Sequence, residues 1–217
     1  MSKIVFCDFD GTITAVETFA GMLKEFAPDL SAQIMPQMYA RTLSLRRGVR
    51  QLLESIPSQK YADILAYAES KPIRPGLAEF LAFLQERAIP FIIISGGIQG
   101  MIETVLKREG LLDKVTAIYG VNLHTQGEYL QVHSDWENET ELVAKALIMA
   151  KYSGVETIAI GDSVTDITMA RRADLVFARD RLIDYLQAEN QPYIPWDNFF
   201  EIREYLLLDL LHNFFMV

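Results

Sequence analysis

Cysteine is nearly absent from the chain, because Cys7 is the only one among 217 residues. A single thiol excludes an intramolecular disulfide and a cysteine-rich zinc site. Cys7 stands inside an apolar run, "KIVFCDF", which has the composition of a buried strand. We therefore expect a buried free thiol that packs as a small apolar residue.

Long hydrophobic runs are also lacking. No uncharged apolar stretch approaches the roughly 18 to 20 residues that cross a bilayer, and too few apolar residues precede Asp8 for a secretory signal. The apolar segment 204–217 is interrupted by polar residues, which indicates a core-facing terminal helix, with a dimer contact as the alternative. These features predict a cytoplasmic protein, monomeric or homodimeric, with no membrane partner.

Basic residues are outnumbered, and the formal net charge is −9. The sequence has no basic stripe of the kind that follows a phosphate backbone, so nucleic-acid binding is not expected. Half of the residues are apolar, which excludes intrinsic disorder. The length suits one domain of ordinary size, or a core domain with a modest insertion.

Short apolar runs alternate with segments of helical period along most of the chain. The strand-like runs are residues 3–9, 90–95, 116–120, 156–162 and 174–178. The helical segments include residues 76–88, 99–110 and 139–154. This alternation predicts an α/β fold in three layers, with a parallel sheet and helices on both faces.

Two stretches interrupt the alternation. Residues 15–73 contain no convincing strand and have helical patterns punctuated by proline, which predicts an inserted helical subdomain. Residues 121–136 alternate with period two around Gln126-Gly127, which predicts a hairpin standing off the sheet. The core domain is then expected to comprise residues 1–14 and 74–217.

Acidic residues follow two of the predicted strands. Asp8 and Asp10 come after the first strand and Asp162 after a later one, and strand ends of an open parallel sheet meet at one edge. Any one of them could serve only as a turn former or a helix cap. Three carboxylates close together would repel one another, so their grouping predicts a hard divalent cation, Mg²⁺, which prefers oxygen ligands.

A serine and two glycines follow another predicted strand. Ser95, Gly96 and Gly97 offer a hydroxyl and free backbone N–H groups at the start of a helix, which would suit an anion. An ordinary tight turn is the alternative reading of this segment. Beside a Mg²⁺ site, it favours binding of a small phosphorylated metabolite and phosphoryl transfer through an aspartyl-phosphate.

Three segments, "DFDGTIT", "ISGG" and "GDSVTD", resemble motifs of the haloacid dehalogenase (HAD) superfamily in order and spacing. The helical insertion resembles the cap of its phosphoserine-phosphatase-like branch. This resemblance implies that Asp8 is the nucleophile and Asp10 the general acid and base, with the main-chain carbonyl of Asp10 also on the metal. It further implies that Asp162 binds the metal and that Asp166 supports the metal site.

The resemblance also implies a phosphate site. Ser95 would bind the transferred phosphoryl group, together with Gly96 and Gly97 of the same motif. Gly11 and Thr12, which follow the two acidic residues of the first motif, are expected to line the same site.

Within this branch, the segments "RTLSLRRGVRQLLESIP", "HSDW", "IGDSVTDI" and "FARD" resemble phosphatases of the methionine salvage pathway. The chain lacks the cysteine-rich stretch that some of those proteins carry after "DW". Phosphoserine phosphatase is the alternative within the class. Two alternatives come from other classes of protein: a receiver-like signalling module, and a module that binds phosphate without catalysis.

One position departs from the superfamily pattern. A lysine usually lies about 20 residues before the "GD" motif, near a helix start, but that register holds Glu139 and Thr140. Lys145 lies more than a turn further along the predicted helix, and its long side chain could reach back, with Lys151 as a weaker substitute. The alternative is that Lys145 is a solvated helix residue.

Substrate choice is expected to come from the helical insertion. Glu17 falls where serine-phosphate phosphatases keep an acid that meets the substrate amine, although the role of an acidic residue in a first helical turn is the favoured explanation. The insertion also has one basic cluster, and we expect Arg50 to be its member that faces a substrate anion. The cluster consists of Arg41, Arg46, Arg47 and Arg50.

Overall fold

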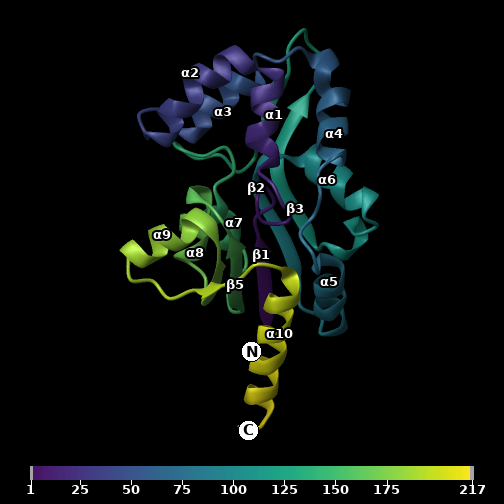
Figure 1. Ribbon diagram of the computed structural model, residues 1–217, viewed down its shortest axis with the longest axis vertical. Helices are drawn as coiled ribbons and strands as arrows, with labels where there is room; N and C mark the ends of the chain where they lie inside the picture. Colours follow the sequence, from purple (N-terminus) through teal and green to yellow (C-terminus); the bar gives the residue numbers. More distant parts are fainter. Residues whose placement is uncertain (1, 216–217) are drawn as a thin grey trace.

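A seven-stranded sheet forms the centre of the protein (Figure 1). The computed structural model describes residues 2–215, with side chains through residue 210. The strand order is β4-β3-β2-β1-β5-β6-β7, and all neighbours are parallel except β3 and β4. The strands are β1 (Lys3–Cys7), β2 (Phe91–Ile98), β3 (Ala117–His124), β4 (Gln131–His133), β5 (Glu156–Gly161), β6 (Leu175–Ala178) and β7 (Ile194–Pro195). The predicted α/β fold with a parallel sheet is confirmed.

Helices cover both faces of the sheet (Figure 1). One side carries α5 (Leu77–Glu86) and α6 (Gln99–Arg108). The other side carries α7 (Lys145–Met149), α8 (Ile167–Ala170) and α9 (Asp180–Ala188). Every residue of β1 is buried, as expected for a central strand of a sheet that is covered on both faces.

The C-terminal helix α10 (Phe199–Phe215) closes the end of the core opposite the insertion (Figure 1). Its buried residues include Phe199, whose ring stacks on Phe80 of α5 with centroids 5.6 Å apart. The predicted core-facing helix is thus present, and residues 216–217 of that prediction lie outside the described part of the chain. No helix within residues 2–215 is long and apolar enough to cross a membrane.

Four α-helices and one short 3₁₀ helix (Ser58–Lys60) make up the insertion above the sheet (Figure 1). The α-helices are α1 (Thr18–Phe26), α2 (Pro28–Tyr39), α3 (Leu45–Leu53) and α4 (Tyr61–Glu69). Ser44 caps α3, since its side chain accepts a hydrogen bond from the amide of Arg47. At the base of the insertion the outgoing and returning chains pair through a bridge between Thr14 and Ile73.

The predicted hairpin is present, with Asn122 to His124 paired antiparallel to β4. It does not stand off the sheet, however, because β3 runs without a break from the parallel sheet into the hairpin. The hairpin also touches the insertion: the amide of Ser58 donates to the carbonyl of Glu128, and that of Leu130 to the carbonyl of Ile56, both at 2.9 Å.

The prediction of a helix over residues 139–154 is wrong in its bounds. Helix α7 spans only Lys145–Met149. The side-chain carbonyl of Asn138 accepts hydrogen bonds from the amides of Thr140 and Glu141, at 2.8 and 2.7 Å, and so holds the preceding residues in a turn. Asparagine side chains often form such local hydrogen bonds in turns rather than in helix interiors. The apolar spacing therefore predicted a helix start that is too early.

Candidate active site

The carboxyl ends of β1 and β5 bring the predicted acidic residues together. Neighbouring register places Cys7 beside Ile160, and the amide of Asp8 donates to the Ile160 carbonyl at 2.9 Å. Asp8, Asp162 and Asp166 are all buried, with 3%, 4% and 0% of their surface exposed. The sheet therefore holds three carboxylates out of bulk water.

Lys145 lies between two of these carboxylates. Its ammonium group is 2.5 Å from Oδ1 of Asp8 and 2.5 Å from Oδ1 of Asp166, and its side chain is 1% exposed. Burial opposes the charged lysine, but the Asp166 and Asp8 carboxylates outweigh that effect and raise its pKa above the usual value. The alternative of a solvated helix residue is wrong, because α7 begins at Lys145 and directs its side chain into the site.

Asp166 is fixed by backbone donors. Its Oδ2 accepts hydrogen bonds from the amides of Asp162 and Ser163, at 2.9 and 3.0 Å. A Cβ atom on Gly161 would lie 2.6 Å from the Asp166 carboxyl carbon, so glycine is needed for this close approach. These contacts orient Asp166 toward Lys145.

Asp162 accepts a hydrogen bond from the hydroxyl of Thr12 at 2.8 Å. Desolvation, followed by the charges of Asp166 and Asp8, raises the pKa of Asp162 from 3.8 to about 9. Desolvation and Asp166 likewise raise the pKa of Asp8 to about 7 despite Lys145. The site thus has more negative charge than the protein groups around it neutralise.

Asp10 lies in the turn after β1, two residues beyond Asp8. Its Oδ1 accepts from the amide of Phe19 in α1 at 2.9 Å, and its Oδ2 from the hydroxyl of Ser95 at 3.1 Å. Desolvation and the charge of Asp8 raise the pKa of Asp10 to about 7. Asp10 can therefore exist in either protonation state near neutral pH.

The serine and glycine segment differs from the expected helix start. Ser95 and both glycines belong to β2, and α6 begins only at Gln99. The amide of Gly97 is not free, since it donates to Ser95 Oγ at 2.9 Å. A Cβ atom on Gly97 would lie 2.6 Å from Asp10 Oδ2, so this glycine allows Asp10 and Ser95 to meet.

Gly11 forms the tight turn after β1, with a positive φ of 80°. A Cβ atom here would lie 2.6 Å from Asp162 Oδ2 and 3.2 Å from Glu17 Oε1. Glu17 is exposed, yet its carboxylate reaches the edge of the site. Desolvation, Asp10 and Asp166 raise the pKa of Glu17 to about 7.

Arg50 does not join the other predicted site residues. Its guanidinium donates to Glu137 Oε2 at 2.7 Å, to the Val132 carbonyl at 2.9 Å and to Glu54 at 3.3 Å. These acceptors hold Arg50 against residues 132–137. The expectation that Arg50 faces a substrate anion used its charge alone and stays a prediction.

Sequence reasoning missed Arg74, which is 8% exposed. It donates from Nε to the carbonyl of Thr12 at 2.9 Å and from Nη2 to the carbonyl of Gly11 at 2.6 Å. These bonds stabilise the turn that carries Asp10. The only signal was its place in "KPIRPG", where the chain returns from the insertion.

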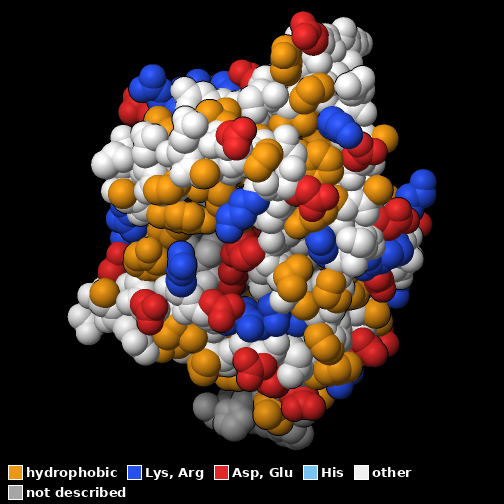
Figure 2. All heavy atoms as spheres, turned by 45° about the horizontal axis from the view of Figure 1, so that its top comes forward, with side chains coloured by type: hydrophobic (Ala, Val, Ile, Leu, Met, Phe, Trp, Pro, Cys, Tyr) orange, Lys and Arg blue, Asp and Glu red, His pale blue; other side chains and the backbone are white. Residues whose placement is uncertain are grey.

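The acidic cluster has the composition of a metal site. One carboxylate oxygen each from Asp8, Asp162 and Asp166 lies within 4.8 Å of the others. All three donors are oxygens, which suits a hard cation rather than zinc. On the face shown in Figure 2, acidic side chains line a central hollow and basic side chains flank it.

Solved structures of phosphoserine phosphatase have the same fold. An apo form covers 94% of this chain and 99% of its own length, with a TM-score of 0.69 and 22% identity. A structure from T. onnurineus covers 94% of both chains, with a TM-score of 0.71 and 15% identity.

Curated relatives match nearly the full length. A 2-hydroxy-3-keto-5-methylthiopentenyl-1-phosphate phosphatase of Microcystis aeruginosa (strain NIES-843 / IAM M-2473) is 99% identical over 96% of this chain and 99% of its own. A Bacillus cytotoxicus protein of the same name is 33% identical over 95% of this chain and 96% of its own. The family model for haloacid dehalogenase-like hydrolases matches residues 2–174. The chain therefore belongs to the haloacid dehalogenase-like hydrolase family.

Proposed function

We propose that this protein is a Mg²⁺-dependent phosphomonoesterase that hydrolyses 2-hydroxy-3-keto-5-methylthiopentenyl-1-phosphate in methionine salvage. The observation that carries the proposal is the pairing of buried Asp8 with Lys145, beside Asp162 and Asp166, in a chain that is 99% identical to a phosphatase of that name. The receiver-like alternative has no support from the family match. The binding-module alternative rested on a displaced lysine, and Lys145 contacts Asp8.

The metal would be held by Asp8 and Asp162, with Asp166 supporting the site and the main-chain carbonyl of Asp10 as a further ligand. Bound there, Mg²⁺ would neutralise charge on the phosphoryl oxygens and lower the pKa of the carboxylates around it. The three buried oxygen donors support this assignment.

In the first chemical step, a carboxylate oxygen of Asp8 attacks phosphorus, and the bond from phosphorus to the leaving oxygen breaks. Asp10 donates its proton to that oxygen, so that a neutral alcohol departs and an aspartyl-phosphate remains on Asp8. Lys145 opposes the rise in the pKa of Asp8 and so favours its ionised form before the attack. Ser95 would orient the transferred group, a role supported by the hydrogen bond from its hydroxyl to Asp10.

In the second step, Asp10 takes a proton from water, and the water oxygen attacks the phosphorus of the aspartyl-phosphate. The bond from Asp8 to phosphorus breaks, which releases inorganic phosphate and regenerates the carboxylate. A carboxyl group with a pKa of about 7 suits both roles of Asp10, because each protonation state is accessible near neutral pH.

We assign residues 15–73 as a cap over this site, with 1–14 and 74–217 as the core. The pairing of Thr14 with Ile73, and of the Ala15 amide with the Pro72 carbonyl at 2.9 Å, supports these bounds. The amide of Phe19 donates to Asp10 and so connects the cap to the site. A cap in this position would exclude bulk water during phosphoryl transfer.

The test is phosphate release from a panel of phosphorylated metabolites, with and without Mg²⁺, for the wild type and Asp8→Asn. We expect the keto-phosphate to give the largest kcat/KM, and Asp8→Asn to lose activity on every substrate. A preference for phosphoserine would overturn the substrate assignment. Undiminished turnover by Asp8→Asn would overturn the mechanism.

A further inference from the structure

Helix α3 and its C-cap residue carry three charged side chains at four-residue spacing, Arg46, Arg50 and Glu54. Residues at this spacing lie along one stripe of a helix. All three side chains on this stripe contact residues 132–137, which precede Lys145 in the sequence. The stripe therefore connects the helical insertion to the chain that leads into the site.

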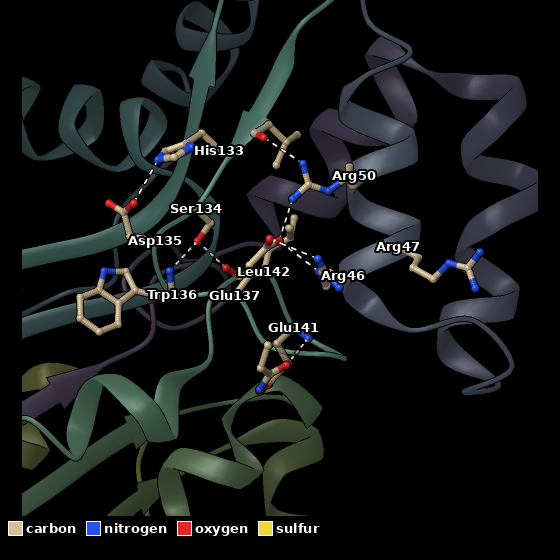
Figure 3. A network of polar contacts seen from close by, with 12 residues as sticks. Arg46, Arg47, Arg50, His133, Ser134, Asp135, Trp136, Glu137, Glu141 and Leu142 are labelled. Carbon is tan, nitrogen blue, oxygen red and sulfur yellow. Dashed lines mark hydrogen bonds and ion pairs between the residues drawn. The ribbon is translucent and has the colours of Figure 1, made fainter.

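The two arginines of the stripe converge on Glu137 (Figure 3). Arg46 binds both carboxylate oxygens, with Nε 3.1 Å from Oε2 and Nη2 3.2 Å from Oε1. Arg50 adds a third contact, with Nη2 2.7 Å from Oε2. The paired donors of a guanidinium fix the direction of a carboxylate as well as its position.

Backbone contacts hold the same segment at both ends. Arg50 Nη1 donates to the carbonyl of Val132 at 2.9 Å, and Glu54 accepts from the Val132 amide at 3.3 Å. At the other end of the stripe, the amide of Arg46 donates to the carbonyl of Thr140 at 2.7 Å. Residues 132–140 are thus fastened along the length of α3.

The fastened segment folds back on itself immediately before Lys145. The Ser134 hydroxyl donates to the carbonyl of Leu142 at 2.5 Å. The amide of Ala144 donates to the carbonyl of Trp136 at 2.8 Å. Ala144 is the residue directly before Lys145, so a displacement of the segment at Glu137 is transmitted to the start of α7.

We propose that Arg46, Arg50 and Glu137 are positioning residues for Lys145, an inference that rests on the proposed function. The stripe of α3 sets the position of residues 132–144, and this segment sets where Lys145 stands between Asp8 and Asp166. The same contacts make the placement of Lys145 dependent on the position of the helical insertion. The stripe lies within the segment "RTLSLRRGVRQLLESIP" noted in the sequence, and its partners Val132 and Glu137 flank the segment "HSDW".

The exposure of these groups favours orientation over stability as their role. The side chains of Arg46, Arg50 and Glu137 are 39%, 30% and 30% exposed. Ion pairs that solvent reaches to this extent add little to the free energy of unfolding. Their loss should therefore displace Lys145 without unfolding the protein.

The test compares Arg46→Met/Arg50→Met with the wild type and with a matched control. Arg47 belongs to the same helix, and its side chain points away from the stripe (Figure 3), so Arg47→Met is the control. We expect kcat of the double variant to fall about ten- to hundredfold, as for other small displacements of catalytic groups. KM should stay within about threefold, and the loss should be equal for the keto-phosphate and an aryl phosphate, because Lys145 acts at Asp8 and the phosphoryl group common to both.

Two further variants separate orientation from damage to the fold. Glu137→Gln keeps the shape of the side chain and should also lower kcat, whereas Arg46→Lys/Arg50→Lys keeps the charges and should recover part of it. Wild-type kcat in either Glu137→Gln or the methionine double variant would overturn the proposal.

Chemical labelling gives a readout that does not require turnover. Lys145 is 1% exposed and should resist an amine reagent in the wild type and in Arg47→Met. The double variant should show labelling of Lys145, measured by mass spectrometry of its peptide. If Lys145 stays protected in the double variant, the proposal is wrong, whereas an inactive wild type would contradict the proposed function alone.

Discussion

A buried lysine between two buried carboxylates dominates the site at the scale of single residues. Lys145 makes both contacts at 2.5 Å, and neither carboxylate is more than 5% exposed at its side chain. Removing one partner from such a group leaves charges that nothing compensates. Lys145 therefore affects stability, metal affinity and turnover at once. Its removal should lower stability and turnover but raise the affinity for the metal.

Lys145→Met should lower kcat by at least a hundredfold and reduce the free energy of unfolding of the metal-free protein by about 3 kcal/mol. Its Mg²⁺ affinity should rise, because the cation then meets carboxylates that no longer share an ammonium group. Isothermal titration calorimetry measures that affinity and urea unfolding the stability. Weaker Mg²⁺ binding in the variant would show that Lys145 helps to build the site rather than competing with the metal.

Asp10 differs from the clustered carboxylates Asp8, Asp162 and Asp166 because its partners are Ser95 and the Phe19 amide. As a general acid it should matter most when the leaving group is poor. Asp10→Asn should slow the single-turnover release of the alcohol from an alkyl phosphate by about a hundredfold or more. Release of 4-nitrophenol should slow less than tenfold, and equal losses for both substrates would contradict the assignment as acid.

At the scale of elements, the strands and their ends followed from the sequence, but one helix boundary did not. The apolar runs located β1, β2 and β5, and so Asp8, Asp10 and Asp162. The apolar spacing of residues 139–154 hid the turn at Asn138, and the helix start was placed too early. With that helix start, Lys145 was expected more than a turn beyond the usual position of the lysine, whereas in the structure it is the first residue of α7.

Contacts between segments that are far apart in the chain could not be predicted from the sequence. Arg74 lies in a predicted turn, and Arg50 belongs to the basic cluster of the predicted helical insertion. Arg74 binds main-chain carbonyls at the site, and Arg50 binds Glu137, which is 87 residues away in the chain. No local sequence pattern marks the acceptors of these two arginines, because both contacts depend on how the insertion packs against the core.

The bulge in β2 offers a prediction at this scale. The pairing with β3 shifts register between Ile94 and Ile98, and Gly97 faces Asp10 there. In Gly97→Ala the new Cβ would lie 2.6 Å from Asp10 Oδ2, so the carboxyl must move and kcat should fall about tenfold or more. Mg²⁺ affinity, measured by calorimetry, should not change, because the clash is with the Asp10 side chain and not with Asp8, Asp162 or the Asp10 main-chain carbonyl. A parallel loss of affinity would contradict this separation.

For the molecule as a whole, the insertion and the core meet on two sides of the site. Helix α3 contacts the segment before Lys145, and the end of α2 contacts α9. Arg181 lies 6.0 Å from the ring centre of Tyr39, and Arg41 lies 5.6 Å from that of Tyr185. In one contact the core provides the cation and the insertion the ring, and in the other the roles are reversed. Both cation–π contacts hold the insertion against the core.

Excess negative charge in the core should make the stability of the whole protein depend on pH and metal. The folded state raises the pKa of Asp8 from 3.8 to about 7 and that of Asp162 from 3.8 to about 9. Between the unfolded pKa of 3.8 and these raised values, the folded chain binds more protons than the unfolded chain. The free energy of unfolding therefore falls as pH rises through this range. Urea unfolding of the metal-free protein should show this fall up to about pH 9, and saturating Mg²⁺ should reduce it.

Asp162→Asn identifies the source of that pH dependence. Because the variant lacks the group whose pKa is about 9, its metal-free stability should fall less between pH 7 and pH 9 than that of the wild type. Asp174→Asn is the matched control: hydrogen bonds from Thr157 lower the pKa of Asp174, so it is ionised in both states throughout this range. The control should keep the wild-type slope, and an unchanged slope in Asp162→Asn would mean that other groups titrate there.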